Sequence, residues 1–354
     1  MIASVLLLAP RMGLKLEEQV FGLAIGVVVA GLAQAVFQMP GLRREGFRYA
    51  WVTPWHDPTV REVVVKMIPG SIGVAAFQIN VLVTQSFSYW FEPTIVSTFN
   101  YSVRLMELPQ GLFGISLATF LLPTLSGLAA DKKFPEFQAT LKQGLSYLSL
   151  ANLFAAAMAL ALAVPIVRLL FERGEFDAAA TYRVALALAC LAPGLLLFSM
   201  NNILARAFYA LKDIQTPMKI SLVCLALNLV FALWLVRPYR EAGLAVANTL
   251  SAGFNTALLL FALRKKLARL EMAGLPQTVF TLVGAAAVAG AVGFGLYHFW
   301  DARLGHANLA VKFGAVFVPA ALAGAVYWLL AMWAKVPAAK EMSSLIGQRG
   351  RRRK

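Results

Sequence analysis

The stretch Tyr101–Ser126, YSVRLMELPQGLFGISLATFLLPTLS, places Arg104 and Glu107 inside an apolar run that extends from residue 94 to residue 125. Of the 17 acidic residues in the chain, Glu107 is the only one set deep within such a run. A charge at the middle of a bilayer costs about 2.5–3.5 kcal/mol on insertion scales, so it persists where it is paired or faces water. At a spacing of three residues, the two side chains share one helix face and can neutralise each other. The pair therefore predicts a site for polar or anionic cargo within a membrane.

The composition of the whole chain also indicates a membrane protein. Of its 354 residues, 60% are hydrophobic and 14% are charged, and the mean hydropathy is +0.71. A soluble domain carries about 25% charged residues. The apolar runs are long and do not alternate in the ~10-residue pieces of a membrane barrel. We therefore expect an all-α polytopic membrane protein.

Ten apolar segments, the first of them incomplete, are expected to form transmembrane helices. They are residues 1–12, 19–39, 63–91, 95–125, 143–167, 180–211, 217–236, 242–263, 276–299 and 311–334. On this map the chain begins within a helix. Threaded alternately through a bilayer, the segments put 21 Lys and Arg residues in the loops of one side and 9 in those of the other. Because cytoplasmic loops carry the excess of Lys and Arg, both termini are predicted to be cytoplasmic.

The net charge of +15 does not indicate a nucleic-acid partner, because the basic residues lie at the ends of apolar runs and in the tail Arg349–Lys354. The sequence contains no phosphate-binding loop and no histidine or cysteine pattern typical of a metal site. We therefore predict no enzyme activity, no cofactor and no metal site.

Two loops have compositions suited to a membrane surface. Residues 42–66 mix arginines with aromatic residues, which is typical either of an interfacial helix or of a solvated loop with anchoring aromatics. Residues 131–143 space Phe134, Phe137 and Leu141 at helical intervals, with lysines on the other side. That pattern predicts an interfacial amphipathic helix.

The helix expected over 95–125 has one polar face. At 3.6 residues per turn, Asn100, Arg104 and Glu107 fall on a single stripe. Pro109 removes a backbone hydrogen bond and crowds the preceding turn, so a bend is expected near residues 105–108. A kinked helix with a concave polar face could line a cavity.

Arg104 offers five fixed donors to an anionic group, and Glu107 can hold the guanidinium when cargo is absent. The alternative is that the two residues only staple the helix internally. On the helix expected over 63–91, Gln78 and Gln85 share a face, so they either line the same cavity or join neighbouring helices. The candidate substrate-binding residues are Arg104, Glu107, Asn100 and Gln78.

Below the polar stripe lie Gly111 and Gly114. Stripes of small residues usually mark close helix packing in membranes, so we interpret these two glycines as a packing surface.

The run Tyr101–Ser126 resembles the signature helix of the MurJ/MviN family of lipid II flippases, in the multidrug/oligosaccharidyl-lipid/polysaccharide exporter superfamily. LFERGEF (Leu170–Phe176) and ARAFYALKDIQTPMKI (Ala205–Ile220) match the same family. The resemblance covers the chain from about Met1 to Ala334. It implies a fourteen-helix fold of two six-helix lobes and an extra helix pair, of which this chain corresponds to the part from within the fifth helix onward.

The resemblance divides the chain into four parts. Residues 1–62 correspond to a remnant of the amino-terminal lobe, with a partial helix, one full helix and a cytoplasmic interfacial loop. Residues 63–270 correspond to the carboxyl-terminal six-helix lobe, residues 271–334 to the extra pair, and residues 335–354 to a basic cytoplasmic tail. The chain thus looks amino-terminally truncated, and a missing or separately encoded lobe is one expected partner.

The function implied by the resemblance is translocation of lipid II, a lipid-linked peptidoglycan precursor, across the bacterial cytoplasmic membrane. The family's essential arginine and the glutamate one turn later fall on Arg104 and Glu107. Lipid II and membrane lipids are the implied partners, and the last helix pair is implied to form a groove for the polyprenyl tail. Some relatives also bind sodium through aspartates. Thr84 stands in the corresponding region here and residues 217–236 and 242–263 contain no acid, so we predict no such site.

Two alternatives remain open at this point. The chain could export another lipid-linked oligosaccharide or a drug, which a change of headgroup chemistry in a binding assay would reveal. It could also be an inactive lobe that acts only as an interaction protein, because a lone lobe cannot alternate access around a central site.

Overall fold

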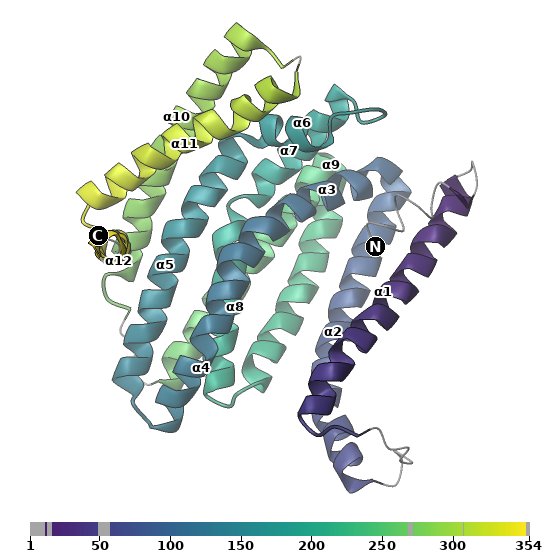
Figure 1. The fold of residues 1–354 in the computed structure, drawn as a ribbon, viewed down its shortest axis with the longest axis vertical. Coiled ribbons are helices and arrows are strands. Elements are labelled where there is room, and N and C mark those ends of the chain that lie inside the picture. Colours follow the sequence, from purple (N-terminus) through teal and green to yellow (C-terminus); the bar gives the residue numbers. More distant parts are fainter. Residues whose placement is uncertain (1–10, 13–15, 49–56, 268–271, 307, 352–354) are drawn as a thin grey trace. The chain divides into compact units, whose positions relative to one another are not determined.

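The computed structural model describes residues 11–12, 16–48, 57–267, 272–306 and 308–351, and within these residues it contains helices and no strands (Figure 1). The chain divides into two compact units, Met1–Met67 and Ile68–Lys354, with the boundary inside α2. The helices are α1 (Leu16–Arg44), α2 (Pro58–Phe91), α3 (Pro93–Pro109), the π-helix η4 (Gln110–Ile115), α4 (Ser116–Ala130), α5 (Phe134–Ala161), α6 (Ala163–Phe171), α7 (Ala178–Leu191), α8 (Gly194–Ala210), α9 (Gln215–Lys266), α10 (Leu275–Leu304), α11 (Leu309–Trp333) and α12 (Pro337–Arg351).

The all-α polytopic membrane fold is confirmed, whereas the count of ten spans is not. By length and composition, six described helices can cross a membrane, or seven if the pair α7 and α8, bent by 47°, is one span. Each expected segment from residue 19 onward falls on one or two helices. The expected segment 1–12 lies, except for its last two residues, outside the described part of the chain.

The expected interfacial helix over 131–143 is wrong. Helix α5 begins at Phe134 and continues without a break to Ala161. Phe137 and Leu141 are fully buried in the protein core and do not lie on a lipid surface. Their helical spacing was read correctly, but it packs this face against neighbouring helices.

The irregularity expected near residues 105–108 lies a little further along the chain. Helix α3 ends at Pro109, and the next six residues form the π-helix η4 before α4 begins at Ser116. A proline ring crowds the turn before it, and a wider π turn is one way for a helix to accommodate the mismatch. Within this wide turn, the hydroxyl of Ser116 donates to the carbonyl oxygen of Gly111 at 3.0 Å.

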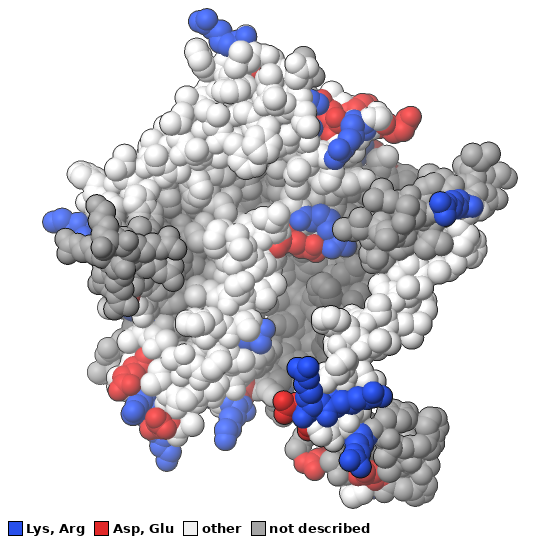
Figure 2. Space-filling view, viewed as in Figure 1, with Lys and Arg blue, Asp and Glu red and all other residues white. Residues whose placement is uncertain are grey.

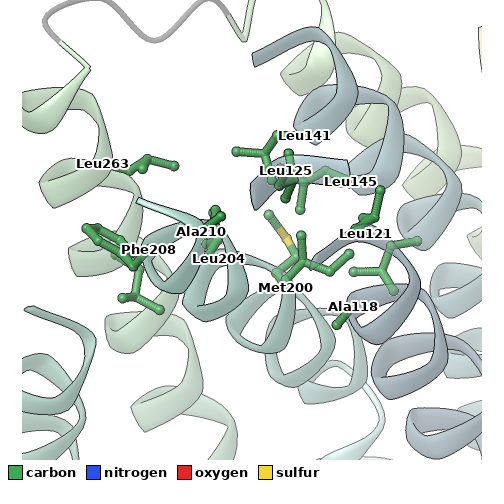
Figure 3. Close-up of a cluster of buried hydrophobic side chains, with 14 of the residues drawn as sticks. Ala118, Leu121, Leu125, Leu141, Leu145, Met200, Leu204, Phe208, Ala210 and Leu263 are labelled. Atoms are coloured by element: carbon green, nitrogen blue, oxygen red, sulfur yellow. The ribbon is translucent and has the colours of Figure 1, made fainter. Parts of the chain in front are cut away.

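The largest buried cluster of the second unit joins four helices. Figure 3 shows its side chains converging from α4, α5, α8 and α9. Leu125, Leu145 and Leu204 are fully buried in it. Because lipid is as apolar as leucine, tight packing rather than exclusion of water holds such helices together in a membrane. This cluster fixes α8 and α9, which form part of the site described below.

The carboxyl-terminal helices pack on α5. Figure 1 shows α10 and α11 beside α5 at one edge of the second unit, with a shared core that includes Ala289 and Ala323. The expected basic tail over 335–354 contains a helix, α12. The amide Nε2 of Gln143 on α5 donates to both carboxylate oxygens of Glu341 on α12, at 2.9 and 3.0 Å.

Gly114, but not Gly111, behaves as the packing surface expected for the two glycines. A Cβ added at Gly114 would lie 2.6 Å from the Oγ and 2.9 Å from the Cβ of Ser199 on α8, whereas one at Gly111 meets no described atom within 4 Å. We expect Gly114→Val to lower the free energy of unfolding by about 1–3 kcal/mol, the usual effect of overpacking. Thermal unfolding of the purified protein in detergent measures this change. Gly111→Val is the matched control, and equal losses in the two variants would contradict the prediction.

Candidate functional site

A cavity of about 740 Å³ lies within the second unit, between α2, α3, α8 and α9; we call it the polar cavity. Half or more of its lining residues carry polar side chains. Its lining is Gln78, Asn80, Val81, Thr84, Gln85, Phe99, Asn100, Val103, Arg104, Glu107, Phe198, Asn201, Ser221, Cys224, Leu225, Asn228, Asn248, Ser251, Ala252 and Asn255. Figure 2 shows that most of the surface on this face of the molecule is uncharged, with a small group of basic and acidic side chains near its middle.

Arg104 and Glu107 form an ion pair at the polar cavity. The Nη1 of Arg104 donates to the Oε2 of Glu107 at 2.8 Å, as the three-residue spacing predicts. The side chains are 74% and 52% exposed, so the pair is not enclosed between tightly packed helices. The guanidinium therefore keeps donors available to a ligand that enters the polar cavity.

Asn100 lies about one turn before Arg104 on α3, and the Nε2 of Gln85 on α2 donates to its Oδ1 at 3.4 Å. Gln78, two turns before Gln85 on the same helix, also lines the polar cavity. The structure thus places the four residues predicted from the sequence, Gln78, Asn100, Arg104 and Glu107, on one cavity.

The sequence analysis did not select the amides that α8, α9 and the middle of α2 contribute. We call them the amide wall: Asn80, Asn201, Asn228, Asn248 and Asn255. A signal for part of it was present. Residues 221 and 228, and again 248 and 255, are polar pairs seven residues apart in apolar runs, which puts the members of each pair on one helix face.

Hydrogen bonds to the main chain hold these amides in place. The Nδ2 of Asn80 donates to the carbonyl oxygen of Leu225 at 2.7 Å, which joins α2 to α9. The Nδ2 of Asn248 donates to the carbonyl oxygen of Leu244 at 3.0 Å. The hydroxyl of Ser251 donates to the carbonyl oxygen of Cys224 at 2.7 Å, which joins the two halves of α9. The amide wall is therefore oriented before any ligand arrives.

A network of ion pairs joins three of the helices around the polar cavity. Arg183 on α7 donates from Nε and Nη2 to the two carboxylate oxygens of Glu241 on α9, at 2.7 and 2.8 Å. Its Nη1 donates at 2.5 Å to Glu92, the residue just before α3. Hydrogen bonds from Thr94 and then Arg183 hold the pKa of Glu92 below its ordinary value, although burial acts in the opposite direction.

Glu241 stands where α9 breaks. Its neighbour Arg240 has φ 51° and ψ −129°, a strained conformation for a residue other than glycine. A Cβ at Gly243 would lie 2.2 Å from the carbonyl oxygen of Leu235, so the two halves of α9 meet closely here. Glu241 is 4% exposed and was missed as a buried acid, although the charged interruption RPYRE at residues 237–241 was visible between two apolar runs.

No group of three or more His, Cys, Asp or Glu residues able to hold a metal ion occurs in the described part of the chain. Thr84, which stands where some relatives are implied to use an aspartate, lines the polar cavity and is 9% exposed.

The known proteins that resemble this chain agree with one another. The family model described as "Lipid II flippase MurJ" matches residues 1–313. A protein of Haemophilus influenzae named "Probable lipid II flippase MurJ" is 36% identical over 271 residues, which cover 75% of this chain and 52% of that protein. A protein of Burkholderia cenocepacia named "Lipid II flippase MurJ" is 35% identical over 294 residues, which cover 81% and 56%. A relative from Vibrio cholerae is 34% identical over 275 residues, which cover 74% and 52%.

A solved structure titled "Lipid II flippase MurJ, inward closed conformation" has the same fold. The two structures superpose with a TM-score of 0.67 at 17% sequence identity, over 90% of this chain and 62% of that chain. The chain spans about half the length of the curated relatives it matches. Because the family model covers residues 1–313, this multi-pass membrane protein belongs to the MurJ family of lipid II flippases.

Proposed function

We propose that this chain takes part in moving lipid II from the inner to the outer leaflet of the bacterial cytoplasmic membrane, by alternating access around a cationic site. The observation that carries the proposal is the exposed ion pair of Arg104 and Glu107 on the polar cavity. An arginine in an apolar span is retained where it meets an anion or water, and a diphosphate is an anion that a guanidinium binds with two parallel hydrogen bonds. The names of the matched relatives support the same cargo.

In the proposed mechanism, Arg104 and Glu107 work as a unit. Without cargo, the carboxylate holds the guanidinium at 2.8 Å. A diphosphate that enters the polar cavity competes with Glu107 for the same donors, and the carboxylate recovers them when the cargo leaves. Glu107 thus prevents binding so tight that release would be slow. Asn100 and Gln78 add uncharged hydrogen-bonding groups beside this pair.

The lipid tail has its own candidate place in this proposal. An apolar cavity of about 540 Å³ lies between α5 and α10 and includes Leu153, Ala157, Gly290 and Phe294 in its lining. Small residues there leave room along the helices. A polyprenyl chain in this groove would remain in apolar surroundings while the headgroup occupies the polar cavity.

The orientation and the division of the chain are part of the proposal. The excess of Lys and Arg on one side supports cytoplasmic positions for both termini. We assign residues 1–62 to the amino-terminal lobe, residues 63–270 to the carboxyl-terminal lobe, residues 271–334 to the extra pair and residues 335–354 to the cytoplasmic tail. A chain segment that completes the opposing lobe is a further partner in this proposal.

Binding by the purified protein tests the cargo. Native mass spectrometry in detergent compares lipid II with a lipid-linked oligosaccharide of different sugars and with a cationic drug. A charge-assisted hydrogen bond contributes roughly 1.5–3 kcal/mol, so we expect lipid II to bind at least about tenfold more tightly than the drug. Equal binding of both lipid-linked sugars would favour an exporter of broader range. Preferred binding of the drug, or no binding of any probe, would contradict the proposal.

A further inference from the structure

We propose that the amide wall and Thr84 form a second subsite in the polar cavity, which recognises an uncharged part of the cargo rich in hydroxyl or amide groups. This inference rests on the proposed function, because it assigns the sugar and peptide part of the headgroup to one wall and the diphosphate to Arg104. The amide wall carries no charge, and the charged lining residues of the polar cavity, Arg104 and Glu107, both belong to α3.

Two oxygen atoms of the lining point to a ligand. The Oγ1 of Thr84 and the Oδ1 of Asn255 are buried and have no hydrogen-bond partner among the described residues. Both residues line the polar cavity, and Thr84 is more than nine-tenths buried. An unsatisfied buried polar group typically costs about 1–3 kcal/mol, so such a group is retained where something else satisfies it.

The chemistry of these atoms selects the kind of ligand. A carboxamide oxygen only accepts hydrogen bonds, and the Thr84 hydroxyl can either accept or donate. A diphosphate offers acceptor oxygens and negative charge, so the Oδ1 of Asn255 would repel it. Sugar hydroxyls and peptide N–H groups are donors, and they match this oxygen.

The rest of the amide wall is suited to the same ligand. Main-chain carbonyls hold Asn80 and Asn248 in fixed orientations, and the hydroxyl of Thr256 donates to the Oδ1 of Asn201 at 2.9 Å. Groups fixed before binding lose little freedom when the ligand arrives. An oriented set of neutral amides distinguishes one sugar or peptide from another, which a single flexible charge does not.

Two probes with the same tail and diphosphate test this inference in the purified full chain. Lipid II carries the sugars and the peptide, and undecaprenyl diphosphate carries neither. We expect Thr84→Val and Asn255→Leu each to weaken lipid II binding about three- to tenfold, the usual effect of one lost hydrogen bond. Binding of undecaprenyl diphosphate should change less than about twofold. The matched controls are Thr119→Val and Asn202→Leu, outside the polar cavity, which should leave both affinities unchanged.

The melting temperature of the ligand-free variants separates binding from packing. The replaced oxygens have no partner among the described residues, so their removal should keep or raise the melting temperature. A fall in melting temperature with equal weakening for both probes would show a packing role and overturn the inference. Sodium-dependent stabilisation that Thr84→Val removes would also overturn it, because the oxygens would then hold a cation.

The wild-type protein and Arg104→Gln distinguish this inference from the proposed function. Equal affinity of the wild type for the two probes would overturn the second subsite and leave the diphosphate site standing. Arg104→Gln should weaken both probes alike, and no effect on either would remove the diphosphate site while the second subsite remained. Failure of the wild type to bind either probe would overturn both.

Discussion

Replacement of Arg104 by alanine should abolish lipid II flipping while leaving membrane insertion and abundance unchanged. The substitution removes the cationic side chain of the polar cavity and leaves Glu107 without the partner that lies 2.8 Å away. A diphosphate would then meet an unpaired carboxylate. Loss of a charge-assisted hydrogen bond costs roughly 1.5–3 kcal/mol, or about ten- to a hundredfold in binding, and like-charge repulsion adds to it.

The measurement uses a full-length relative with the equivalent substitution, in a depletion strain and in a lipid II accessibility assay. Arg104→Lys keeps the charge but loses the two parallel donors, so it should retain part of the activity. Arg206→Ala is the control, because Arg206 lies on α8 and does not line the polar cavity. Normal growth and flipping in Arg104→Ala would place the cargo site elsewhere.

The sequence revealed Arg104 and Glu107 because charge inside an apolar run is rare and costly. The same reasoning did not select the amide wall, since a single asparagine in an apolar helix is more often a packing residue than a ligand. Spacing placed residues 248 and 255 on one helix face. Whether that face meets the one bearing Asn228 depends on the break at Arg240, which is a property of the tertiary structure.

Periodicity identified helices more reliably than their surroundings. The spacing of Phe137 and Leu141 fits a helix on a lipid surface and equally a helix packed against protein, and here the core of α4 and α8 covers it. Pro109 gave the correct region for an irregularity, but crowding by a proline can be relieved by a bend or by a π turn. Neighbouring contacts, such as that of Gly114 with Ser199, are needed to decide between them.

Removal of one charge from the pair of Arg183 and Glu241 should destabilise the second unit strongly. Glu241→Gln leaves the buried half of a bidentate contact uncharged, and Arg183 then retains only the contact with Glu92. Breaking a buried ion pair by neutralising one partner costs about 3–5 kcal/mol, because the remaining charge is left poorly compensated. Reversible unfolding in mixed detergent micelles measures this loss. Glu175→Gln, at an exposed acid without the same buried contact, is the control and should change the stability by less than about 0.5 kcal/mol.

The double variant Arg183→Met with Glu241→Leu decides what the ion pair does. If the pair only anchors α7 to α9, apolar replacements of similar volume should restore most of the stability lost in Glu241→Gln, because they remove both desolvated charges. If the strain at Arg240 is held by the same charges, the double variant should remain unstable, since Glu92 would keep only its 3.5 Å contact with Arg240. Because Glu241 is 4% exposed and stands at the break in α9, we expect the second result, with stability and lipid II binding lost together. Full recovery of both in the double variant would contradict this expectation and reduce the network to an anchor.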